Sequence, residues 1–306
     1  MNQIYKVIWS RVKRCYVVVS EIAGRCGKNG GVASEKKSMP VRAFLCALAV
    51  TGCLLPGMAE AKTEYGPGAS ATGTASVAVG DDAKAAAVNS SAYGLKSKAL
   101  SSHSVAIGNE ASVGKGDPDP ESSQNGIAIG HGANVTVNPA TATPGITDKS
   151  GGIAIGHNAT TKDINTVALG TGTVGQGAQA VAIGRNAHTD GNNTVAIGNN
   201  TWVRSTNGFA LGNEARAGID EAGNIIGKDN DQAFGSNARA WGGSSMAFGN
   251  NAKAANGGAI AMGNGSQSRG DWGVAIGNGA KALADGARAL GANSNASGVN
   301  AAAIGW

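Results

Sequence analysis

A glycine that returns at a nearly constant spacing is the feature that most constrains the fold of this chain. It occurs fifteen times, usually fourteen residues apart, at Gly80, Gly94, Gly108, Gly130, Gly156, Gly170, Gly184, Gly198, Gly212, Gly235, Gly249, Gly263, Gly277, Gly291 and Gly305. A fixed period over so many copies is typical of a solenoid, in which each repeat buries its apolar face only by stacking on its neighbours. We therefore expect one stacked domain over residues 77–306.

Each glycine follows a three-residue apolar stretch such as Val195-Ala196-Ile197. The outer two positions are mostly large and apolar, whereas the middle position is alanine in every copy. Because side chains alternate along a strand, the outer two share one face and the alanine points to the other. An exposed position would vary in type, so we expect the large residues to fill the coil and the alanines to contact another chain. Representative residues of the core and the oligomer contact are Ala106, Ala182, Ala196, Ala275, Ile107, Ile183, Ile197 and Ile276.

A second short strand follows the glycine. Two turn-forming residues, often Asn or Gly, come first and suit a tight corner because they tolerate positive φ. A small side chain such as Ala187 comes next, then a mostly polar or basic residue, and often a small or aliphatic one. This pattern places the small side chains inside and the polar ones outside. Two short strands per fourteen residues predict one flat coil of an all-β, parallel β-roll.

Residues 1–61 differ in composition from the rest of the chain. They hold nine Lys or Arg and three acidic residues of the chain's 25 and 20, and all four cysteines. The remainder, with 16 basic and 17 acidic residues, is near neutral, so its charge does not indicate a nucleic acid or another polyanion as partner. Without cysteine it has no disulfide framework, which suits passage through an oxidising compartment.

An apolar run over residues 40–55 has a basic flank and ends near Ala59-Glu60-Ala61. These features predict a secretory signal peptide over residues 31–61, cleaved between Ala61 and Lys62, and the run is too short for a membrane-spanning helix. Lipoprotein processing at Cys53 is the alternative, because the preceding residues loosely fit a lipobox. The Gly-, Ala- and Thr-rich residues 62–76 are expected to form a flexible lead-in.

Two parts of the chain resemble known families. Residues 1–30, a basic amphipathic segment, resemble the extended signal peptide region of Gram-negative autotransporters and two-partner secretion exoproteins. The stretch 193–201 (NTVAIGNNT), with 103–111 and 165–173, resembles the head repeat of trimeric autotransporter adhesins of the YadA type, and the likeness covers nearly all of 77–306. The resemblance implies a homotrimer of left-handed parallel β-rolls on the bacterial surface that binds host matrix or cells, with collagen as one such ligand.

The sequence departs from the family in lacking a neck motif, a heptad stalk and C-terminal strands for an outer-membrane anchor, and it stops one residue after Gly305. We expect an incomplete head, attached to the membrane only through an anchor absent from this chain, or secreted if no anchor exists. The other reading is a secreted structural or polyanion-binding β-solenoid. An ice-binding solenoid would need a regular array of Thr on one face, whereas the outward position here carries residues such as Lys, Arg, Asn, Gln and Trp202. A polysaccharide lyase would need a cluster of carboxylates and longer coils, and the sequence shows neither.

Several motifs of the chain resemble ligand-binding or catalytic sites. The run from Gly170 to Gly175 fits a dinucleotide fingerprint but no helix is expected after it. Calcium-binding rolls need Asp soon after the glycines, where this chain has Asn, His, Thr or Arg. His131 and His157 share a repeat position and are either turn residues or ligands of a shared metal or anion. No Ser, His and Asp set has a spacing that predicts convergence, so we expect neither catalysis nor a cofactor.

Two sets of residues are candidates for ligand binding. The outward position of the second strand carries the cations Lys84, Lys98, Arg216, Arg239, Lys253 and Lys281, which we call the basic ladder; it either binds a ligand or prevents sheet association. Asn193 and Thr194 belong to the stretch closest to the family's collagen-associated repeat. Three insertions, near residues 114–125, 135–150 and 218–231, are loops that either carry binding or vary freely.

Overall fold

The computed structural model describes residues 5–10, 15–20, 62–114, 123–136, 151–226 and 228–306. The chain divides into two units, Met1–Ala59 and Glu60–Trp306. In the first unit, β1 (Tyr5–Ser10) and β2 (Cys15–Ser20) pair as antiparallel strands. Sequence reasoning had assigned no fold to this segment. The apolar run over residues 40–55 and Ala61 lie outside the described residues.

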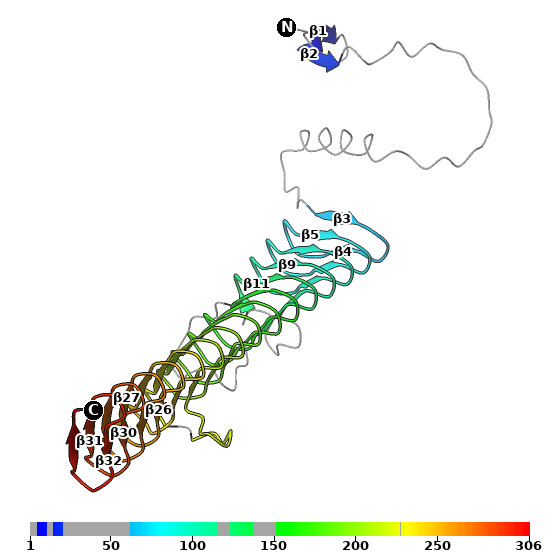
Figure 1. Ribbon diagram of the computed structural model, residues 1–306. Helices are drawn as coiled ribbons and strands as arrows, with labels where there is room; N and C mark the ends of the chain where they lie inside the picture. The colour runs from blue at the N-terminus through cyan, green and yellow to red at the C-terminus, as the bar shows by residue number, and fades with distance from the viewer. Residues whose placement is uncertain (1–4, 11–14, 21–61, 115–122, 137–150, 227) are drawn as a thin grey trace. The chain divides into compact units, whose positions relative to one another are not determined.

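The second unit is a parallel β-solenoid built from two sheets, with coils stacked one on the next (Figure 1). The first sheet has 16 strands: β3 (Thr63–Tyr65), β5 (Val77–Val79), β7 (Ser91–Tyr93), β9 (Val105–Ile107), β11 (Ile127–Ile129), β13 (Ile153–Ile155), β15 (Val167–Leu169), β17 (Val181–Ile183), β19 (Val195–Ile197), β21 (Phe209–Leu211), β23 (Gln232–Phe234), β25 (Met246–Phe248), β27 (Ile260–Met262), β29 (Val274–Ile276), β31 (Arg288–Leu290) and β33 (Ala302–Ile304). Successive strands pair in register, so equivalent residues of the repeats lie side by side.

The second sheet has 15 shorter strands: β4 (Ser70–Ala71), β6 (Lys84–Ala85), β8 (Lys98–Ala99), β10 (Ser112–Val113), β12 (Asn134–Val135), β14 (Thr160–Thr161), β16 (Val174–Gly175), β18 (His188–Thr189), β20 (Trp202–Val203), β22 (Arg216–Ala217), β24 (Arg239–Ala240), β26 (Lys253–Ala254), β28 (Gln267–Ser268), β30 (Lys281–Ala282) and β32 (Asn295–Ala296). Each coil thus contributes one strand to each sheet, except that β33 at the end of the stack belongs to the first sheet alone. The predicted all-β, parallel β-roll with two short strands per repeat is confirmed.

Residues 62–76, expected to be a flexible lead-in, instead form the first coil. Thr63 pairs with Val77, and Ser70 pairs with Lys84. The repeat is hard to recognise in the sequence of this coil because Glu64 occupies the position that alanine holds in the following coils. The Glu64 carboxylate accepts a hydrogen bond from the backbone N–H of Ala71 at 2.6 Å, which ties the two strands of this coil together.

The corner after the first strand explains the repeating glycine. Gly198 has φ of +137°, and a Cβ added to it would lie only 2.7 Å from the carbonyl carbon of Gly212 on the next coil. Only glycine meets both demands. Two residues later Asn200 has φ of +53°, and its side chain accepts a hydrogen bond from Asn186 Nδ2 at 3.1 Å, which links neighbouring corners.

The alanines fill the interior of the coil, so the expected orientation of the first strand was wrong. Ala196 is fully buried between the two sheets, as are Thr201 and Val203 of the same coil. Val195 and Ile197 point outward and are only partly buried. The interior is narrow along the first strand, where the inward residue of β5 to β31 is alanine, and the larger buried side chains Val113, Val135 and Val203 lie on the second strand instead. Several buried hydroxyls donate to carbonyl oxygens of the turns, as where Ser76 Oγ donates to Gly73 O at 2.6 Å.

Candidate binding surfaces

The outer side of the first sheet is an apolar surface, which we call the apolar stripe. It consists of the first and third residues of the odd-numbered strands β5 to β33, which form the first sheet. Polar side chains interrupt it at Ser91, Gln232 and Arg288. Leu211 is 41% exposed and Phe248 is 52% exposed. The rings of Phe209, Phe234 and Phe248 follow one another along it, with centroid separations of 5.0 and 5.7 Å. A contiguous apolar surface of this extent is typical of an interaction site.

The structure separates the residues that sequence reasoning had grouped as core and oligomer contacts. Ala106, Ala182, Ala196 and Ala275 are fully buried inside the coil. Ile107, Ile183, Ile197 and Ile276 lie on the apolar stripe. The alanines therefore cannot form the outer contact that was expected of them, whereas the isoleucines are available for one.

The outward side of the second sheet carries the basic ladder. Lys84 pairs with Lys98, and Arg216, Arg239 and Lys253 stand on three successive strands. Lys281 is separated from Lys253 by Gln267. The six cations share one register position, as predicted, but form separate groups rather than a continuous row.

The third insertion, which follows β22, folds back over the ladder. An antiparallel bridge between Ile219 and Ile225 closes it into a short turn. Glu221 lies 3.1 Å from Lys253 Nζ, and its carbonyl oxygen accepts a hydrogen bond from Arg239 Nη1 at 3.2 Å. Two ladder cations are thus engaged by the chain itself. Residues 115–122 and 137–150, the main parts of the other two insertions, lie outside the described residues.

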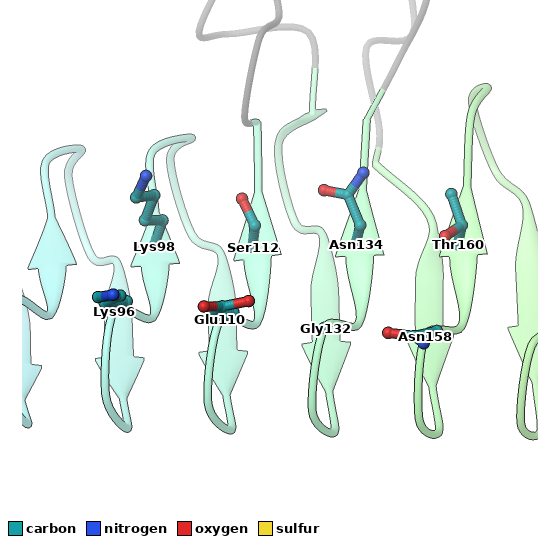
Figure 2. Close-up of a pocket in the computed structure, with 8 residues that line it drawn as sticks. All are labelled: Lys96, Lys98, Glu110, Ser112, Gly132, Asn134, Asn158 and Thr160. Carbon is teal, nitrogen blue, oxygen red and sulfur yellow. The ribbon is translucent and has the colours of Figure 1, made fainter.

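A polar groove of about 790 Å³ runs across four coils near the first two insertions. Figure 2 shows its lining residues in two rows, one on the strands of the second sheet and one at the corners; they are Lys98, Ser112, Asn134 and Thr160, and Lys96, Glu110, Gly132 and Asn158. None of its described lining residues has an apolar or aromatic side chain, and its length follows the stacking direction. Such a surface suits an extended polar segment better than a small apolar molecule.

A cluster of aromatic and charged side chains lies on β18, β20 and the residues that follow them. The rings of His188 and Trp202 stack at 4.4 Å, and the Arg204 guanidinium lies 5.0 Å from the centre of the indole ring. Asp190 lies 2.6 Å from both His188 Nε2 and Arg204 Nε. Burial acts to raise the pKa of Asp190, but the hydrogen bond with His188 and the nearby positive charges outweigh it and hold the pKa below its ordinary value. Sequence reasoning missed this cluster because it combines positions from two neighbouring repeats.

The remaining predicted residues fall into different environments. Thr194 is fully buried and its hydroxyl donates to Gly191 O at 2.8 Å, so it has no surface for a ligand, whereas Asn193 is exposed at a corner. The segment Gly170–Gly175 forms a corner and strand β16, not the start of a helix. Lys62 directly precedes β3 at the start of the first coil.

The histidines that share a repeat position do meet. The rings of His131 and His157 stack with centroids 5.1 Å apart and planes within 11°. No group of three or more His, Cys, Asp or Glu side chains within the described ranges is arranged to hold a metal ion. The described residues also contain no helix long and apolar enough to cross a membrane.

Comparison with known families gives two matches. Residues 1–50 match the Extended Signal Peptide of Type V secretion system, a longer span than the thirty residues expected. The YadA head domain repeat matches residues 71–97, 85–111, 149–173, 176–201, 229–252, 242–266 and 284–306. A search of curated proteins found no match to the chain.

The two matches fit the architecture. The head-repeat matches together cover half of the chain, and the matched segments are coils of the solenoid. The signal-peptide match lies at the start of the chain, where exported proteins carry such a segment. The chain belongs to the family of YadA-like trimeric autotransporter adhesins.

Proposed function

We propose that the chain is the head of a non-enzymatic adhesin that assembles as a homotrimer through its apolar stripes and binds a host matrix protein along its polar side. YadA-like adhesins in general form homotrimers, bind host matrix and have no enzymatic activity, and the extended signal peptide suggests export to the Gram-negative cell surface. The observation that carries the proposal is the apolar stripe, which leaves a single chain with one long uncovered apolar face.

The arrangement of the two sheets supports separate surfaces for trimer assembly and for ligand binding. Because the apolar stripe and the basic ladder lie on opposite sides of the coil, assembly through the stripe leaves the ladder, the polar groove and the third insertion facing solvent. Each of these features would then be present on three chains. Weak contacts repeated along a rod gain by avidity, by about 100-fold or more where the geometry allows.

The matrix ligand proposed is collagen or a protein like it, and the corner asparagines around Asn193 are candidate contacts. The test is surface binding of the full-length exported protein to collagen, fibronectin and heparin at low and high salt. Collagen binding that resists salt, and survives replacement of the six ladder cations by Gln, supports the proposal. No binding to either protein would contradict it.

A polyanion-binding solenoid is the second candidate, and the basic ladder favours it. Attraction between exposed charges is screened over about 8 Å at physiological salt. Heparin binding that fades steeply with salt and disappears in the Gln variant, without collagen binding, would assign this function instead.

A further inference from the structure

A cavity of about 270 Å³ lies between the second sheet and the third insertion. Trp202, Arg204 and Arg216 line it from the sheet, and Ile219, Gly223 and Ile225 line it from the insertion. The shape of the insertion is fixed by its antiparallel bridge and by Asp220, which accepts hydrogen bonds from Asn224 N at 2.7 Å and Asn224 Nδ2 at 2.9 Å. The contacts of Glu221 with Lys253 and Arg239 hold it against the second sheet. The cavity therefore has a cationic and aromatic floor and an apolar wall.

Arg216 is the unexplained residue of this cavity. Its Nε is buried and has no hydrogen-bond partner, and no carboxylate in the described part of the chain lies within ion-pair distance of it. Arg239 stands beside it on the next strand, so burial and a like charge lower the pKa of Arg216, and the more distant Glu214 offsets them only in part. A buried guanidinium N–H without an acceptor is unfavourable, and an anion in the cavity would supply one.

Arg204 and Trp202 differ from Arg216 in already having partners. Arg204 is paired with Asp190 at 2.6 Å, whereas Arg216 has Glu214 only beyond ion-pair distance among the described residues, so Arg216 is the cation of the cavity with room for a further anion. His188 stacks on Trp202 and does not line the cavity, so it holds the indole ring in place without filling the space.

We propose that this cavity binds one acidic sugar residue, a pyranose ring that carries a carboxylate or a sulfate group. A guanidinium presents parallel N–H donors that match either acid group. Trp202, Ile219 and Ile225 would cover the C–H surface of the ring, a contact that a free inorganic anion cannot make. The volume is slightly below the usual range for ligand pockets, which fits one ring rather than a peptide segment. The site does not depend on binding of a matrix protein.

The test is calorimetric titration of the full-length protein with methyl β-glucuronide, methyl glucoside 6-sulfate, methyl glucoside and sodium sulfate. The two acidic glycosides should bind at least about tenfold more tightly than the neutral glycoside, because only they pair with the guanidinium. They should also bind more tightly than sulfate alone, because only they contact the indole and the isoleucines. Equal binding of acidic and neutral glycosides, or no binding of either acidic glycoside, would overturn the proposal.

Three single-residue variants test whether the acidic glycosides bind in this cavity. Arg216→Gln should weaken binding of the acidic glycosides by about tenfold or more, whereas Lys281→Gln, which removes a charge at the equivalent ladder position, should leave it unchanged. Ile225→Glu adds a negative charge at an exposed position of the wall and should weaken binding as well. Thermal unfolding of each variant checks that the coils remain folded. Loss of affinity by the same factor in the Arg216 and Lys281 variants would show general charge attraction and refute the site.

Discussion

Ala196 and Ile197 are neighbours on strand β19, yet Ala196 is fully buried between the two sheets while Ile197 lies on the apolar stripe. The same relation holds for each alanine–isoleucine pair named from the sequence, such as Ala106 and Ile107. The alanine packs between the two sheets of the coil, and the isoleucine forms part of the outer apolar surface. Stability of the coil and assembly of the rod should therefore respond to different substitutions.

Enlarging the buried alanine should destabilise the coil itself. Ala196→Leu adds three carbons to an interior that has no room for them, and overpacking of this kind typically costs about 1–3 kcal/mol. Thermal unfolding followed by circular dichroism should show a lower midpoint. Ile197→Leu is the matched control, because it keeps the volume on the outer face and should change the midpoint little. Equal losses in the two variants would contradict the orientation of the strand.

The corner glycine should be irreplaceable because of the neighbouring coil. Gly198→Ala places a methyl group in a backbone conformation that disfavours it and against Gly212, whereas Gly223 also has positive φ, +89°, but has nothing within 4 Å of its added Cβ. Strain in φ alone costs about 1–3 kcal/mol. Denaturant unfolding should show a clearly larger loss for Gly198→Ala than for Gly223→Ala. A similar loss at both positions would mean that the contact between corners is unimportant.

Asp231 should make the stability of the rod depend on pH. It is fully buried and accepts hydrogen bonds from Gly243 N at 2.8 Å, Ser245 N at 3.2 Å and Ser245 Oγ at 2.7 Å. Burial raises the pKa of Asp231 above its ordinary value despite these bonds. The folded state thus holds the proton more tightly than the unfolded state, and the stabilisation, complete below the ordinary carboxyl pKa, is lost as pH rises through the folded pKa.

Comparison with Asp231→Asn isolates this effect, since asparagine keeps the acceptor oxygen but does not titrate. Urea unfolding at several pH values, upward from the ordinary carboxyl pKa of 3.8, should show the wild type losing stability relative to the variant. A difference that stays constant, or that grows in favour of the wild type as pH rises, would contradict the account.

The sequence predicted the strands, their register and the glycine corner because each depends on a local pattern that recurs. It could not tell which face of the first strand lies inside, because an unvarying small residue is consistent with either a narrow interior or a close contact outside. The first coil was missed because Glu64 breaks the alanine pattern and makes up for it with a backbone hydrogen bond. The cavity at Arg216 was missed because the path of the third insertion depends on tertiary contacts, such as that of Glu221 with Lys253.

The central claim is that the apolar stripe holds three chains together, and light scattering of the full-length protein tests it most directly. The wild type should have the mass of a trimer, and Ile197→Glu should shift it toward the monomer, because burying an unpaired carboxylate in an apolar interface costs several kcal/mol or more. Gln267→Glu, an equal change of charge on the second sheet, should remain trimeric. A wild type that is a folded monomer, or an Ile197→Glu variant that remains as trimeric as Gln267→Glu, would contradict the claim.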